Sequence, residues 1–177
     1  MGYAGGTKEN PSYSSLGDHS ETIQIDYDLA QVSYRELLDV FWDSHNPEQQ
    51  HYSRQYMSVV FYHNDEQKRL AMETKDREEA KTEGKIFTEI VPFSEFYLAE
   101  DYHQKFRLRQ VPELVNEFSA IYPDIDDFIA STAVARVNGY VDGYGTCAAL
   151  KRELSSFGMS SVGSNKLLNI VCGLQVQ

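Results

Sequence analysis

The chain has 177 residues, of which 41% are hydrophobic and 12% aromatic, so it is long and apolar enough to bury a core. A net charge of -11 and a pI near 4.8 exclude nucleic acids and anionic membranes as expected partners, because the field of the protein would repel both. With no long apolar run and no basic, apolar leader, we expect neither a membrane span nor a secretory signal.

The first part of the chain alternates between strand and helix signals. Glycines and the turn sequence Asn10-Pro11-Ser12 predict a loop over residues 1–21. Strict alternation of apolar and polar residues over 22–27 predicts a half-buried strand. Ser33 and Glu36 have capping-box spacing, which predicts a helix that stops before residue 46.

Three further elements complete this part. Residues 56–62 are strongly apolar, which predicts a central strand. Asn64 is a good N-cap for a charged helix that we expect to reach about Glu83 and end at Gly84. Residues 86–91 alternate again and predict a strand. This order favours an α+β fold (an α/β sandwich) in which helices pack on a mixed sheet.

After Ala99 the pattern becomes helical. Helical periodicity is found over residues 102–109, 111–120, 126–137, 150–157 and 166–172, with a glycine-rich loop at 139–145. We therefore predict a single domain over 1–177, in which 107–177 form a mostly helical C-terminal extension.

Cofactor and metal signals are weak. The five histidines show no His-x-x-x-His spacing; they are His19, His45, His51, His63 and His103. The sequence also has no pair of closely spaced cysteines and no phosphate-loop motif. We expect no bound metal or cofactor. Two cysteines are too few for a disulfide scaffold and fit a reducing compartment, which favours a cytoplasmic location.

Five short motifs occur in an order that resembles the peptide methionine sulfoxide reductase A family. They are Gly2-Tyr-Ala-Gly-Gly, Asn10-Pro-Ser-Tyr13, Gly17-Asp-His-Ser-Glu21, Gln55-Tyr56-Met-Ser58 and Phe96-Tyr-Leu-Ala-Glu-Asp-Tyr-His-Gln104. The resemblance covers residues 1–106. The family's Gly-Cys-Phe-Trp motif, which holds the nucleophilic cysteine and normally precedes the first of these motifs, is missing.

The resemblance implies roles for particular residues. Glu21 matches the carboxyl group that hydrogen-bonds and protonates the sulfoxide oxygen, although a solvated carboxylate is the commoner role for a glutamate at a strand end. Tyr13 and Tyr56 match the two tyrosines whose hydroxyls face that oxygen. His51 stands where the family usually has an aspartate. We expect it to bind substrate and to alter the pH dependence of any activity.

Two further residues, His19 and Asp101, are predicted to line the substrate site through their motifs. Cys147, beside a glycine-rich segment, is a candidate resolving cysteine, although an inert buried thiol is the commoner outcome. Cys172 lies in an apolar helical stretch and is predicted to be part of the core.

The function implied is the reduction of free or peptide methionine-S-sulfoxide by a thiol- or selenol-dependent mechanism, in protein repair under oxidative stress. Its partners would be oxidised-methionine proteins, with thioredoxin or a small thiol as reductant. Because the nucleophile is missing, we expect the chain as given to be inactive alone, and an upstream cysteine or selenocysteine would supply the missing group. Two alternatives stay open: a module that binds methionine sulfoxide without reducing it, and an acidic interaction protein.

Overall fold

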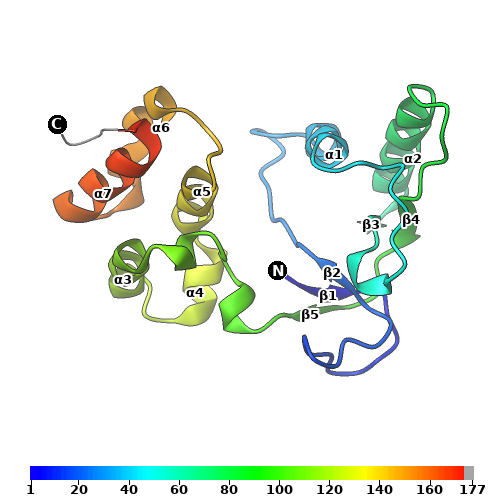
Figure 1. Ribbon diagram of the computed structural model, residues 1–177, viewed down its shortest axis with the longest axis horizontal. Coiled ribbons are helices and arrows are strands. Elements are labelled where there is room, and N and C mark those ends of the chain that lie inside the picture. Colours follow the sequence, from blue (N-terminus) through cyan, green and yellow to red (C-terminus); the bar gives the residue numbers. More distant parts are fainter. Residues whose placement is uncertain (174–177) are drawn as a thin grey trace. The chain divides into compact units, whose positions relative to one another are not determined.

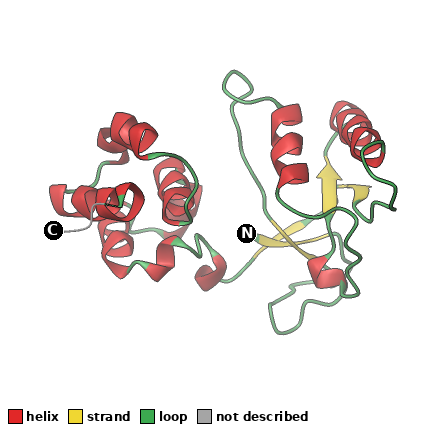
Figure 2. Ribbon diagram, turned by 45° about the horizontal axis from the view of Figure 1, so that its top comes forward, coloured by secondary structure: helices red, strands yellow, loops and turns green. Residues whose placement is uncertain are grey.

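The computed structural model describes residues 1–173 as two compact units, Met1–Ala99 and a second unit that begins at Glu100 (Figure 1). The first unit contains all the strands of the described residues and two helices, and the second is helical (Figure 2). The predicted α+β fold with a helical C-terminal part is confirmed.

The first unit has two small sheets. In one, β1 (Gly2–Ala4) lies between β2 (Ser20–Thr22) and β5 (Phe96–Leu98), antiparallel to both. Tyr3 of β1 faces Glu21 on one side and Tyr97 on the other, which fixes the backbone of Glu21. In the other sheet, β3 (Val59–Tyr62) and β4 (Glu89–Pro92) run parallel.

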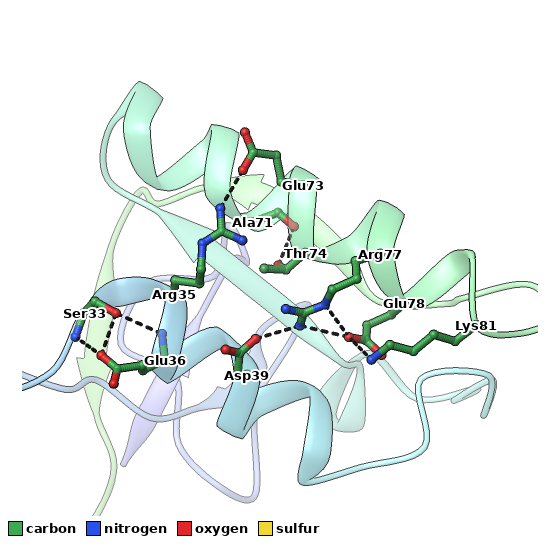
Figure 3. Close-up of polar contacts among 10 residues, drawn as sticks. All are labelled: Ser33, Arg35, Glu36, Asp39, Ala71, Glu73, Thr74, Arg77, Glu78 and Lys81. Atoms are coloured by element: carbon green, nitrogen blue, oxygen red, sulfur yellow. Dashed lines mark hydrogen bonds and ion pairs between the residues drawn. The ribbon is translucent and has the colours of Figure 1, made fainter.

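Helices α1 (Tyr34–Asp43) and α2 (Asp65–Glu79) begin as the sequence predicts. Ser33 and Glu36 form the expected capping box at α1, and Asn64 caps α2 by accepting a hydrogen bond from the Gln67 amide. Ion pairs join the exposed faces of the two helices (Figure 3), among them Arg35 with Glu73 and Arg77 with Asp39, each at 2.7 Å. Their apolar faces share a core with β3 that contains Leu38, Trp42, Val60, Ala71 and Ile86.

Strand boundaries were predicted less well. The prediction of a strand over 22–27 is wrong. Strand β2 ends at Thr22, and the side chains of Ile23 and Ile25 are 66% and 51% exposed. Alternation alone does not make a strand where no partner strand pairs with it. The strand expected from Tyr56 begins at Val59, because a 3₁₀ turn, η1 (Arg54–Tyr56), precedes it.

The second unit is a cluster of short helices around its own core. The 3₁₀ turns η2 (Asp101–His103) and η3 (Leu108–Gln110) lead into α3 (Pro112–Ile121), α4 (Ile125–Ala130), α5 (Thr132–Val141), α6 (Cys147–Glu153), η4 (Leu154–Phe157) and α7 (Ser161–Cys172). Ten buried residues fill the core: Leu108, Leu114, Phe118, Phe128, Val134, Val137, Tyr140, Leu150, Phe157 and Leu167. None of the helices in residues 1–173 is long and apolar enough to cross a membrane.

Three predictions for this unit need correction. The helix expected over 126–137 is two helices, because Ser131 ends α4 and caps α5 through its hydroxyl. The loop expected at 139–145 starts later, since α5 continues to Val141. The helix expected over 102–109 is the pair of 3₁₀ turns.

The cysteines also depart from expectation. Cys147 and Cys172 form a disulfide, with their Cα atoms 4.9 Å apart, so neither is a buried inert thiol. The reason is tertiary: α6 packs against α7, which brings the first residue of α6 to the last residue of α7. Both cysteines are only partly buried.

Candidate active site

The loop that leads to Glu21 is held by two consecutive side chains. His19 is 1% exposed; its Nδ1 accepts from the Gly6 amide at 3.1 Å, and its Nε2 donates to the Lys8 carbonyl at 2.8 Å. Asp18 accepts from the Thr7 amide at 2.8 Å and from the Thr7 hydroxyl at 2.9 Å. These bonds with Thr7 lower the pKa of Asp18 to about 2.

Glycine is required where this loop folds back. A Cβ on Gly6 would lie 2.6 Å from Asp18 Oδ1 and 2.7 Å from the His19 ring, so any side chain there would displace both. The Gly-Gly sequence therefore lets the loop pack closely on His19. The backbone that leads into β2 and Glu21 is held in one conformation as a result.

Glu21 is half-buried on β2 and is held by Gln55, whose Nε2 donates to Glu21 Oε1 at 2.6 Å. Gln55 is the middle residue of η1, and two further bonds fix that turn. The Ser20 hydroxyl donates to the Arg54 carbonyl at 2.8 Å, and Arg54 pairs with Glu89 at 2.7 Å. Glu21 is thus positioned by its own strand and by a turn anchored to β2 and β4.

The two tyrosines of the motifs meet at this point. The pKa of Tyr56 is raised, first by the charge that the neighbouring Tyr13 phenol would carry, then by burial, by a hydrogen bond with Tyr13, and by the charge of Glu21. The two phenols and the carboxyl group therefore form one cluster. Both rings remain open to solvent, at 45% exposure for Tyr13 and 54% for Tyr56.

A cavity of about 840 Å³ adjoins this cluster within the first unit. Glu21, Gln55 and Tyr56 are part of its wall, and the rest is mostly apolar, formed by the segment after β2, one face of α1, and β3. The Tyr34 hydroxyl in this wall is buried and has no hydrogen-bond partner among residues 1–173. Burial raises the pKa of Tyr34 to about 12.

The other predicted site residues lie elsewhere. His51 is half-buried in the loop before η1, and no hydrogen bond joins it to the cluster in the described part of the chain. His19 is engaged by backbone groups, so it positions the loop. Asp101, which is exposed in η2, and Cys147 belong to the second unit.

Two features escaped the sequence analysis, one in this site and one in the second unit. One is Gln55, which was quoted only as part of a motif although it bonds the central carboxyl group. Its place beside Tyr56 was the available signal. The other is the disulfide.

Within residues 1–173, no group of three or more histidine, cysteine or acidic side chains is placed to hold a metal ion.

Chemically, this arrangement suits a small molecule with one strongly polar oxygen on an apolar body. The two phenols can donate hydrogen bonds to that oxygen, and a protonated Glu21 can donate a proton to it. The cavity offers apolar surface to the remainder of the molecule.

The family model for peptide methionine sulfoxide reductase matches residues 1–135. The chain belongs to the peptide methionine sulfoxide reductase family. A peptide methionine sulfoxide reductase of Drosophila melanogaster is 37% identical over 166 residues, which cover 90% of this chain and 65% of that protein. The A5 enzyme of Arabidopsis thaliana is 40% identical over 157 residues, covering 80% and 62%.

A solved structure of the reductase family gives the same result for the fold. Reduced Mxr1 from Saccharomyces cerevisiae matches with a TM-score of 0.58 and 31% identity, over 63% of this chain and 70% of that one. The family likeness also extends further than the five motifs. A match over 90% of the chain must include much of the second unit, so the helical part is similar to the Drosophila reductase as well. The chain spans less than two thirds of the length of both curated relatives.

Proposed function

We propose that this chain provides the oxygen-binding part of a methionine-S-sulfoxide reductase, acting on free or peptide-bound methionine-S-sulfoxide. The observation that supports it most is the cluster of Glu21, Tyr13 and Tyr56 beside an apolar cavity, in a member of this family. In this proposal, the phenols donate hydrogen bonds to the sulfoxide oxygen and Glu21 donates its proton to it. His51 supports substrate binding from the loop before η1, and His19 holds the loop that leads to Glu21.

In the proposed reaction, a thiolate or selenolate attacks the substrate. The attacking atom takes the oxygen, the sulfur–oxygen bond of the sulfoxide breaks, and the proton from Glu21 completes a sulfenic or selenenic acid. Methionine is the other product. A dithiol such as thioredoxin, or two small thiols, then reduces that acid with release of water.

The attacking group in this proposal comes from outside the 177 residues. Both cysteines of the sequence are joined in the disulfide, and neither stands in a family nucleophile motif. Cys147 can act as a resolving cysteine only after that disulfide is reduced. We further propose that residues 1–177 work as one reductase-like domain with 107–177 as its extension, in the cytoplasm.

The proposal is tested by measuring binding and turnover separately. The 177-residue chain should bind N-acetyl-methionine-S-sulfoxide methylamide more tightly than the matching methionine compound, and should show no turnover with dithiothreitol. Glu21→Gln should abolish the increase in binding expected at low pH, when Glu21 is protonated. Equal affinity for the sulfoxide and the thioether would refute an oxygen-binding site.

The disulfide also favours a second candidate, a module that binds methionine sulfoxide without reducing it, because it leaves no thiol in these residues. The two functions differ in one measurement. If the protein isolated from its native source has the mass of the printed chain, 20.2 kDa, and binds the sulfoxide without turnover, the binding module is correct. A heavier species with turnover supports the reductase.

A further inference from the structure

The hydrogen bond between Gln55 and Glu21 bears on which carboxyl oxygen can carry a proton. A carboxylic acid has one protonated oxygen and one that only accepts hydrogen bonds. Gln55 Nε2 donates to Glu21 Oε1 at 2.6 Å, so a proton on Oε1 would face another donor. The proton is therefore directed to Oε2, the other oxygen of the carboxyl group.

The turn that carries Gln55 is well placed to impose this choice. Gln55 lies between Arg54, which is fixed to β2 by Ser20 and to β4 by Glu89, and Tyr56, whose phenol belongs to the oxygen-binding cluster. The same turn thus supplies a phenol to the site and restrains the carboxyl group beside it. A change in Gln55 would alter the direction of the proton and leave the Glu21 carboxyl group and both phenols in the chain.

We propose that Gln55 is a positioning residue that binds Glu21 through Oε1 and turns the protonated Oε2 toward the oxygen of the bound sulfoxide. The inference rests on the proposed function for the identity of the ligand. Gln55 therefore sets how well the acid is aimed.

Other ionisable groups near Glu21 do not compete for this role. Tyr3 faces it across β1, and Tyr13 and Tyr56 adjoin it; phenols do not titrate between about pH 4 and pH 8. The Arg54 guanidinium is paired with Glu89 and stays charged over the same range. Asp26 and His63 also line the cavity, so only the part of the pH dependence that Glu21→Gln abolishes is assigned to Glu21.

The test uses the 177-residue chain and the probe N-acetyl-methionine-S-sulfoxide methylamide. Gln55→Met keeps the length of the side chain and removes the N–H donor, and Gln31→Met is the matched control at an exposed site outside the cavity wall. For Gln55→Met, we expect affinity for the sulfoxide to fall about fivefold, as for loss of a hydrogen bond to an uncharged group, and affinity for the matching thioether to stay the same. A merely structural role would lower both affinities equally.

A second readout does not depend on the ligand. In the wild-type chain, the side-chain amide proton of Gln55 should shift in NMR spectra as Glu21 titrates, and Glu21→Gln should abolish that shift. If wild type binds the sulfoxide and Gln55→Met binds it with the same affinity, the positioning role is refuted while the proposed function stands. If the amide shift follows Glu21 but wild type binds no sulfoxide at any pH, the proposed function fails and the proposal fails with it. If the chemical shift of the Gln55 amide proton does not change with pH, the hydrogen bond between Gln55 and Glu21 does not form.

Discussion

Reduction of the Cys147–Cys172 disulfide should destabilise the helical unit by a measurable amount. The bond closes a loop of 25 residues. The chain-entropy relation gives about 12 cal/mol/K for such a loop, or about 3.5 kcal/mol at 25 °C. For a small unit with an m-value of about 1 kcal/mol/M in urea, the midpoint should fall by about 3.5 M.

The assay is urea unfolding followed by circular dichroism at 222 nm, for wild type with and without dithiothreitol and for the Cys147→Ala/Cys172→Ala variant. Trp42, the single tryptophan, is buried in the first unit, so its fluorescence reports on that unit separately. The variant should unfold at lower urea and should not respond to dithiothreitol. A change below about 1 kcal/mol in the wild type on reduction would refute the reasoning.

Three further predictions concern stability. Phe118→Ala removes a fully buried ring from the second core and should cost about 3–5 kcal/mol in urea unfolding; less than half of that would contradict the packing described. Ser33→Ala removes the cap of α1 and should cost about 1 kcal/mol by the Trp42 transition, with Ser53→Ala, at a turn without a side-chain cap, as control. The pKa of Asp18 is about 2 when folded, below its ordinary 3.8, so its contribution is present above pH 3.8 and is lost as the pH falls toward 2. The Asp18→Asn variant should therefore have a lower melting temperature than wild type at pH 7, and its melting temperature should fall less between pH 4 and pH 2. Identical melting temperatures for the two proteins at every pH would argue against the Thr7 contacts.

Elements with strong local signals were predictable from the sequence. The capping box of α1 and the Asn64 cap of α2 act within four residues of each helix start, so the sequence pattern is sufficient there. The strand expected over 22–27 depended on a partner that the sequence pattern does not reveal. Its apolar residues are instead exposed or line the cavity.

The candidate site divides in the same way. Glu21, Tyr13 and Tyr56 were found through motifs, and the structure brings them together. The hydrogen bond between Gln55 and Glu21 joins residues 34 positions apart, and the disulfide of the second unit joins cysteines 25 positions apart. No local sequence pattern specifies such contacts. His19 shows the converse case, because its motif implied a substrate contact and the structure gives both ring nitrogens to the backbone.

The bonds that build the oxygen-binding cluster all lie within the first unit. Glu21 is fixed by β1 and by Gln55, and Tyr56 is fixed by the turn that Ser20 and Arg54 hold. None of these contacts involves a cysteine, and both cysteines lie in the second unit. The proposed recognition of the sulfoxide oxygen therefore depends on no cysteine of this chain. For that reason, a chain without a free thiol can still test that step.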